Sequence, residues 1–265
     1  MRILAGILTA IAVASFASPV QAADGLLMVE TTVAGTTSRT TRVQIERDRL
    51  RTEVGGVAGG ETQIIIFDGP QQVLRYVNFA RKSYTEMTKA DADRMGAQMS
   101  TAMESMKEKI ANMPPEQRAK MEAAMGRMGG AAGAGAPVRP EYKKTGTDTV
   151  GKWTCDKYEG FRGGVKVSEV CTVDPKVLGM TQADLEISKQ VAAFFKTLLP
   201  MGGDQVLGIG TIETQGFAGI PVRRVRYNGT AVASTSEVVE VSRQTFDDAS
   251  YAVPAGFQKQ SMGMK

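Results

Sequence analysis

The stretch SRTTRVQIERDRLRTEV, residues 38–54, decides the fold class of this chain. In its first half Val43 and Ile45 alternate with charged and amide residues. Alternation with a period of two is typical of a strand that has one buried and one solvated face. Asp48 is a turn signal, and a second run with β-branched residues follows it. The stretch therefore predicts two consecutive antiparallel strands.

The flanking segments have the same character. LLMVETTVAG (26–35), TQIIIFDGP (62–70) and QQVLRYVNFARKSYTEM (71–87) are short runs rich in β-branched and aromatic residues, punctuated by Gly, Asp and Asn. The strand pattern resumes near Thr147, and Asn228-Gly229 predicts a tight hairpin turn between two late strands. We therefore expect an antiparallel sheet built from both ends of the chain.

Between these β regions lies MGAQMSTAMESMKEKIANMPPEQRAKMEAAMGRM, residues 95–128, which holds eight of the fifteen methionines. Its Ala, Met, Glu and Lys favour helix, whereas Pro114-Pro115 must interrupt one. The segment predicts a helical hairpin over residues 88–128. The glycine- and alanine-rich residues 129–137 predict a flexible linker after it.

The methionines recur every three or four residues, so on a helix they share one face. That face comprises Met95, Met99, Met103, Met106 and Met113 in the first arm and Met121, Met125 and Met128 in the second. Three interpretations are open. The two faces can pack on each other as core, or form an adaptable apolar surface for a ligand or partner. Alternatively, the soft thioethers of Met99, Met103, Met106, Met121, Met125 and Met128 can bind copper(I) or silver(I).

The first 22 residues have the features of a secretory signal peptide. Arg2 precedes an apolar run over residues 3–17, and Val20-Gln21-Ala22 fits the small-x-small cleavage rule. The run is too short to span a bilayer, and no later segment offers ~20 consecutive apolar residues. We therefore expect export to the periplasm and no transmembrane anchor.

Charge and composition argue against several classes of function. Without Arg2 the chain has 31 basic and 28 acidic side chains, and the net charge of +3 is too small and too interleaved to indicate nucleic-acid binding. The chain contains no histidine, which excludes Ser-His-Asp and Cys-His catalysis and the usual nitrogen ligands of metals. No phosphate-binding P-loop motif is present either. We expect no enzyme and no cofactor, and no metal site other than the methionine alternative.

Cys155 and Cys171 are the two cysteines of the chain. The segment between them predicts a hairpin that turns at Arg162-Gly163-Gly164 and places Cys155 directly opposite Cys171 and Lys157 opposite Glu169. Directly opposed residues lie ~4.5–5.5 Å apart, within reach of a disulfide. In an oxidising compartment we expect this pair to form a structural disulfide.

The order of these segments resembles a known family. The likeness rests on IFDGPQQVLRYVNFARKSYTEM (66–87), VGKWTCDKYE (150–159), VCTVDP (170–175), GIPVRRVRY (219–227) and YAVPAGFQK (251–259). Together with the methionine-rich insert they look like the bacterial domain-of-unknown-function 4412 family, which is similar in fold to the LolA/LolB lipoprotein carriers. The resemblance covers about residues 25–87 and 146–258, while the long methionine insert departs from LolA itself.

The resemblance implies an α+β fold, a curved antiparallel half-barrel with a helix on its concave side. A helix is expected over residues 181–199, with Thr181 and Asp184 at the spacing of a capping box. The expected organisation is a signal peptide (1–22), one LolA-like β domain (23–87 and 138–258), the inserted hairpin (88–128), the linker (129–137) and a flexible tail (259–265).

The resemblance also implies a function, because the hollow of the carriers receives lipoprotein acyl chains. Here an apolar lining is expected from Ile64, Ile65, Ile66, Phe67, Val73, Leu74, Tyr76, Phe194, Phe195 and Leu198. This indicates a non-enzymatic periplasmic protein that binds a lipid or another apolar molecule between sheet and helices. The alternatives are copper(I) or silver(I) sequestration and a chaperone-like module that binds an envelope protein. MPPEQRAKM (113–121) is similar to a turn of small periplasmic chaperones of the Spy and CpxP type.

Overall fold

The computed structural model describes residues 24–55, 62–118, 140–198 and 215–261. The strands in these ranges are β1 (Gly25–Ala34), β2 (Thr37–Ile45), β3 (Arg49–Val54), β4 (Gln63–Asp68), β5 (Val73–Asn78), β6 (Ser83–Thr88), β7 (Glu141–Val150), β8 (Trp153–Arg162), β9 (Val165–Val173), β10 (Ile220–Asn228), β11 (Ala231–Gln244) and β12 (Gln258–Gln260). The helices are α1 (Lys89–Ala111) and α3 (Gln182–Leu198), with short 3₁₀ helices at Pro175–Leu178 and Asp248–Tyr251.

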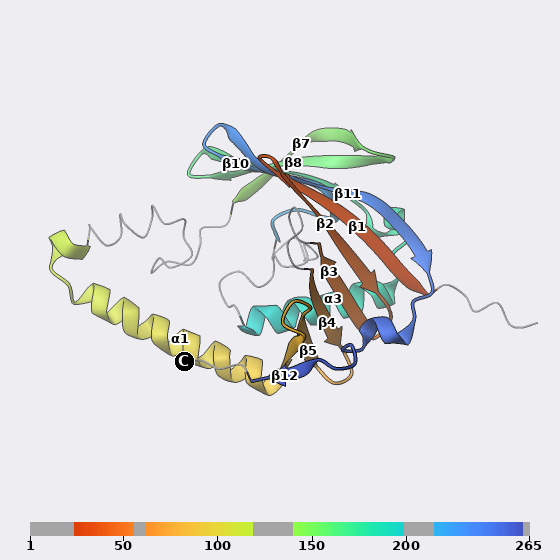
Figure 1. The fold of residues 1–265 in the computed structure, drawn as a ribbon. Coiled ribbons are helices and arrows are strands. Elements are labelled where there is room, and N and C mark those ends of the chain that lie inside the picture. The colour runs from red at the N-terminus through yellow and green to blue at the C-terminus, as the bar shows by residue number, and fades with distance from the viewer. Residues whose placement is uncertain (1–23, 56–61, 119–139, 199–214, 262–265) are drawn as a thin grey trace, which may run out of the picture.

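All twelve of these strands form one sheet in the order β12-β6-β5-β4-β3-β2-β1-β11-β10-β9-β8-β7. Strands β1 to β6 and β7 to β11 are two antiparallel meanders, and the pairing of β1 with β11 joins them. Only β12 pairs in parallel, with β6, among the described strands. The sheet is strongly curved but not closed, because β12 and β7 are its two separate edges (Figure 1). The architecture is therefore a curved, predominantly antiparallel sheet with few helices.

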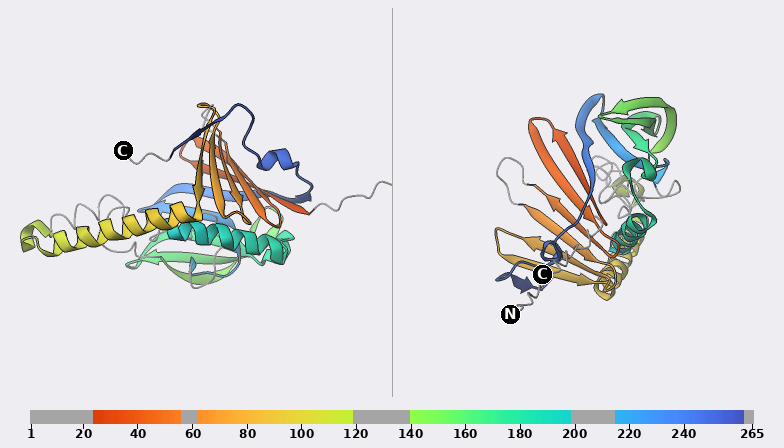
Figure 2. Two further views of the ribbon diagram at one scale, coloured as in Figure 1. Left: turned by 90° about the horizontal axis from the view of Figure 1, so that it is seen from below. Right: turned by 90° about the vertical axis from the view of Figure 1, so that its right-hand side faces the viewer.

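Helix α3 lies across the concave face of this sheet, as the views in Figure 2 show. Its capping box is as expected, since the Thr181 amide donates to the Asp184 carboxylate (2.7 Å) and the Asp184 amide donates to Thr181 Oγ1 (3.2 Å). The Phe194 ring packs edge-on against Phe67 of β4 at a centroid distance of 5.7 Å. Together with Leu26 and other buried residues of the sheet, these contacts form the main core of the domain.

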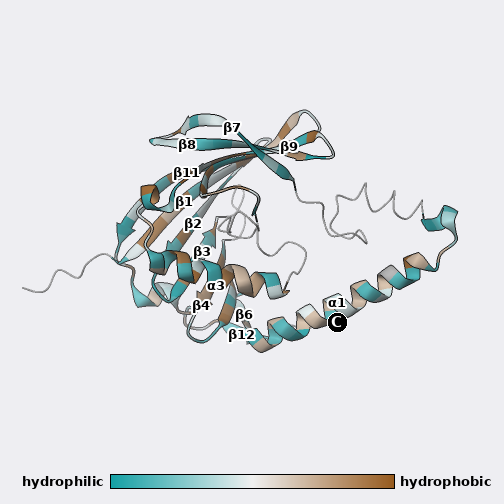
Figure 3. Ribbon diagram, turned by 180° about the vertical axis from the view of Figure 1, so that it is seen from behind, coloured by the Kyte–Doolittle hydropathy of each residue, from teal (hydrophilic) through white to brown (hydrophobic). Residues whose placement is uncertain are grey.

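Helix α1 begins where the methionine-rich hairpin was expected. Thr88 caps it through a capping box with Asp91. Gly96 brings the helix close to α3, because a Cβ added at this glycine would collide with the carbonyl oxygen of Thr197. Beyond this contact α1 extends away from the sheet (Figure 1), and its residues alternate between hydrophilic and hydrophobic along its length (Figure 3). A further helical turn starts at residues 115–118, and the rest of the expected second arm and the linker lie outside the described residues.

The convex face is covered by the chain that follows β11. Tyr251 packs on Ile64, Ile66 and Val77 in a second hydrophobic cluster. The chain then reaches β12, whose residues Gln258–Gln260 pair with β6. Lys259 and Gln260 thus belong to the sheet, although they fall in the segment 259–265 that was expected to be a tail. The reason is an unpaired β6 edge, which offers backbone donors and acceptors to the returning chain.

Candidate functional site

A cavity of about 410 Å³ lies on the concave face, between the sheet and α3. It is lined by Glu30, Thr32, Ala34, Thr37, Arg39, Thr41, Leu50, Thr52, Val54, Ile65, Phe67, Val191 and Phe195. The volume is within the ~300–1,000 Å³ typical of small-molecule sites. Strands β1 to β4 form its floor and α3 its wall.

The register of the strands explains why these residues share the cavity. Thr41 of β2 is paired with Glu30 of β1, and both β1 and β2 contribute every second residue to this face. In the same way Leu50 of β3 is paired with Phe67 of β4, and Thr52 with Ile65. Directly paired residues and residues two apart in a strand point to the same face of a sheet.

The cavity has two chemically different ends. Its apolar end consists of Leu50, Ile65 and Phe67 from the sheet with Val191 and Phe195 from α3. Leu50, Phe67 and Val191 are almost fully buried, and Phe195 packs against the core from a partly buried position. This end therefore offers apolar surface against which an apolar group can be buried.

The other end is polar and consists of Thr32, Thr37 and Thr41 together with Arg39 and Glu30. Burial raises the pKa of Glu30, whereas Arg224, Arg226 and a hydrogen bond with Ser236 act in the opposite direction and only partly offset it. A carboxylate whose pKa is raised in the folded state disfavours folding once it is ionised. Such a group is more typical of a binding or switching site than of a purely structural position.

The lining proposed from the sequence is correct in part. Ile65, Phe67 and Phe195 line the cavity. Ile64 and Ile66 do not, because they point to the convex face and pack under Tyr251. The other expected lining residues, Val73, Leu74, Tyr76, Phe194 and Leu198, are also absent from the cavity wall. Leu74 and Phe194 are buried in the main core, and Leu198 packs against it. The sequence does not show which of the three consecutive isoleucines point to the concave face, because apolar and polar residues do not alternate in this stretch.

The methionines of α1 differ in their surroundings. Met95 is partly buried and packs on the main core next to the α3 contact. Met103 and Met113 are half-buried, and Met99 and Met106 are each 43% exposed. Met121, Met125 and Met128 lie outside the described residues. None of the described methionines lines the cavity.

The two cysteines form a disulfide, with Cα atoms 5.4 Å apart. The expected hairpin register is wrong by two positions, because Lys157 rather than Cys155 is paired with Cys171. The turn contains only Gly163 and Gly164, both at positive φ, and a bulge at Gly160/Phe161 lies before the turn, on β8. Glycine at both central positions favours this two-residue turn over the expected three-residue one.

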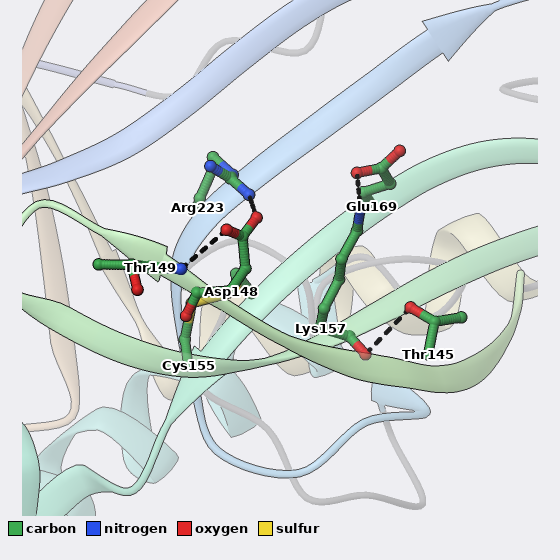
Figure 4. Close-up of a disulfide and its surroundings, with 8 residues drawn as sticks. Thr145, Asp148, Thr149, Cys155, Lys157, Glu169 and Arg223 are labelled. Atoms are coloured by element: carbon green, nitrogen blue, oxygen red, sulfur yellow. Dashed lines mark hydrogen bonds and ion pairs between the residues drawn. A yellow bond between two sulfur atoms is a disulfide. The ribbon is translucent and has the colours of Figure 1, made fainter.

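An ionic cluster surrounds the disulfide (Figure 4). Lys157 Nζ lies 3.3 Å from a carboxylate oxygen of Glu169, although the two residues are not directly paired. Burial raises the pKa of Glu169, but hydrogen bonds from Lys166, Tyr227 and Lys157 outweigh it and lower the pKa to about 2. A hydrogen bond from the Thr149 amide and the neighbouring Arg223 lower the pKa of Asp148. These groups are paired with one another, so they serve the structure of the β7–β10 meander.

Within the described parts of the chain, no three His, Cys, Asp or Glu side chains are grouped so that they could hold a metal ion. In those same parts, neither helix has the length and apolar character needed to cross a membrane.

The sequence-based prediction missed two charged residues that point to the concave face. These are Glu30 and Arg224, whose opposite charges act on each other. A signal was present in GIPVRRVRY, where arginines interrupt a β-branched strand pattern.

Comparisons with known proteins give no family for the chain. No family model matches it, and no curated protein matches it. Among solved structures it is similar to an uncharacterized conserved protein from Thermus thermophilus, with a TM-score of 0.45 and 10% identity over 90% of this chain and 91% of the other.

Proposed function

We propose that this protein is an exported, non-enzymatic binding protein that holds the apolar part of a lipid or similar small molecule between its sheet and α3. The observation that carries the proposal is the 410 Å³ cavity with Leu50, Phe67 and Phe195 at one end. The signal peptide predicted from the sequence supports export, and the resemblance to lipoprotein carriers supports an acyl chain as the guest. The absence of histidine removes the commonest catalytic base.

Energetic arguments agree with a modest affinity. Each ~100 Å² of apolar ligand surface removed from water contributes about 2.5 kcal/mol. A ligand that buries ~400 Å² therefore gains about 10 kcal/mol, from which several kcal/mol of lost ligand freedom must be subtracted. Subtracting ~4 kcal/mol, the lower end of that cost, leaves about 6 kcal/mol, which corresponds to a dissociation constant of tens of micromolar.

Uptake of a neutral, environment-sensitive dye such as N-phenyl-1-naphthylamine tests the proposal. We expect saturable fluorescence enhancement with the wild-type chain. Thr52→Trp should lower the affinity at least tenfold, because Thr52 lines the cavity and an indole would fill part of it. Val239→Trp is the matched control, since Val239 is a 58% exposed strand residue that does not line the cavity. Equal dye affinity in all three proteins would refute the cavity as the binding site.

Native mass spectrometry of the chain purified from its own host is an independent check. We expect an additional mass of lipid size that is released on denaturation. A bare mature chain that also takes up no dye would contradict the proposed function.

The exposed methionines of α1 favour a second candidate function, the binding of copper(I) or silver(I). Met99 and Met106 are each 43% exposed, and Met103 lies between them on the same helix. Thioethers spaced by three or four residues can converge on one soft ion. Replacing Met99, Met103, Met106, Met121, Met125 and Met128 by leucine should abolish copper(I) uptake in competition with a chelator, and unchanged affinity would exclude this function.

The same exposed face suits a partner protein as well as an ion, because flexible, polarizable methionines adapt to varied apolar surfaces. Deleting residues 88–130 should then remove an envelope protein that co-purifies with the full chain. Retention of that partner by the shortened chain would exclude α1 as its docking site.

A further inference from the structure

The polar end of the cavity continues across the sheet toward β10. Thr32, which lines the cavity, shares a hydrogen bond of 2.7 Å between its hydroxyl and that of Ser236 on β11. Ser236 is directly paired with Thr32 on one side and with Arg224 of β10 on the other. Paired residues share a face, so Arg224 points to the same concave side as the cavity. Two strand spacings separate Thr32 from Arg224, or about 10 Å.

Arg224 is a half-buried arginine without a direct partner. No hydrogen bond or ion pair joins its guanidinium to any other residue that the structure describes. Burial lowers the pKa of Arg224, and the charge of Glu30 offsets this only partly. Four side-chain atoms in the described residues are buried from solvent and have no hydrogen-bond partner, and none of them belongs to Arg224. The guanidinium nitrogens of Arg224 therefore remain accessible to solvent.

The charge around Arg224 is positive overall. Arg226 lies two residues further along β10, on the same face and exposed, and is paired with Ser168 of β9. Glu30 is the carboxylate whose charge acts on both arginines. Two guanidinium groups opposed by one carboxylate leave a net positive charge on this part of the concave face. Ser236 of β11, which is paired with Arg224, has a hydroxyl that can donate a hydrogen bond to an anion, whereas the paired residue on β9 is the apolar Val170.

We propose that Arg224, supported by Arg226, binds the acidic head group of an amphipathic ligand whose apolar part lies in the cavity. The inference rests on the proposed function and names the ligand class, an acyl or alkyl chain that ends in a carboxylate or a phosphate. A guanidinium binds either group with two parallel hydrogen bonds, and an unpartnered one gains most from doing so. Thr32 and Ser236 lie between the two subsites and can contact the linking region of the ligand.

Displacement of the neutral dye by four ligands with the same dodecyl chain tests this assignment. Dodecanoate and dodecyl phosphate should displace the dye at concentrations at least tenfold lower than dodecanol, whereas dodecyltrimethylammonium should be weaker than dodecanol. The relative strength of the two acids identifies the preferred head group. Equal potency of all four ligands would overturn the proposal and leave the proposed function intact, while failure of every ligand and of the dye would refute that function itself.

Variants locate the site. Arg224→Met should reduce the preference for dodecanoate over dodecanol to less than twofold and leave dodecanol unchanged. Arg42→Met is the matched control, because Arg42 is paired with Val29 on the opposite face of β1 and β2. Glu30→Gln should strengthen dodecanoate binding severalfold, since it removes the opposing charge. A full acid preference in Arg224→Met, or weaker dodecanoate binding in Glu30→Gln, would overturn the proposal.

Discussion

Replacing Asp184 by alanine should loosen the helix that walls the cavity. Asp184 is 1% exposed and accepts hydrogen bonds from the amide and hydroxyl of Thr181, which start α3. It also forms an ion pair with Arg243 of β11. One carboxylate therefore both caps the helix and ties it to the sheet.

The magnitude follows from these two roles. Loss of a helix N-terminal cap costs about 1 kcal/mol. Removing one partner of a buried ion pair costs ~3–5 kcal/mol. The lower end applies here, because the Arg243 side chain is 27% exposed and still donates to the carbonyl oxygens of Gly179 (2.7 Å) and Asp24 (2.9 Å). We expect Asp184→Ala to lower the free energy of unfolding by about 4 kcal/mol.

Urea unfolding followed by circular dichroism measures this change, and the dye assay reports its effect on the cavity. Glu186→Ala is the control, because Glu186 is an exposed residue of the same helix and should change stability by less than about 0.5 kcal/mol. Asp184→Asn keeps the shape of the side chain and should lower the free energy of unfolding by less than Asp184→Ala does. A loss below about 1.5 kcal/mol in Asp184→Ala would refute the assignment of both roles.

Three further predictions concern other parts of the domain. Changing Cys155 and Cys171 together to serine should lower the free energy of unfolding by about 3 kcal/mol. The reason is that the disulfide closes a loop with a separation of 16 residues and so reduces the entropy of the unfolded chain. Urea unfolding with and without reductant measures this change. Gly96→Ala should lower the melting temperature although alanine favours helix by ~1 kcal/mol, because the new methyl group meets the Thr197 carbonyl; a higher melting temperature would contradict the close α1–α3 contact. The lowered pKa of Glu169 means that its contribution to stability is present above pH 4.5 and is lost as the pH falls toward about 2. Glu169→Gln should therefore destabilise the chain at pH 7 and have little effect near pH 2, and an equal effect at both pH values would contradict this.

Local patterns predicted the elements of this fold well. Alternation in residues 38–54 gave strands β2 and β3, and the spacing of Thr181 and Asp184 gave the start of α3. A tight turn joins β10 to β11 as expected, but its two central residues are Gly229, at positive φ, and Thr230, because Asn228 is still paired with Ala231. These features depend on residues close together in the chain, which is why a single sequence contains them.

Features that depend on distant pairing were not predictable in the same way. The hydrogen bond between Thr32 and Ser236 joins residues 204 positions apart, and nothing local to either residue indicates the other. The inward position of Arg224 follows from the β1–β11 pairing, so the polar part of the candidate site was missed. The disulfide was predicted correctly, but its register was not, because the two-residue turn at Gly163-Gly164 and the Gly160/Phe161 bulge each shift the pairing by one position. A bulge has no clear signature in one sequence.

The central claim, that an apolar ligand lies between the sheet and α3, is tested most directly by nuclear Overhauser effects from a bound ligand to isoleucine methyl groups. Ile65 lines the cavity, whereas its neighbours Ile64 and Ile66 lie in the cluster on the convex face. With methyl-labelled protein and dodecanoate, we expect cross-peaks between the ligand chain and Ile65 and none to Ile64 or Ile66. Cross-peaks to Ile64 and Ile66 without Ile65, or none to any of the three at saturating ligand, would contradict the account.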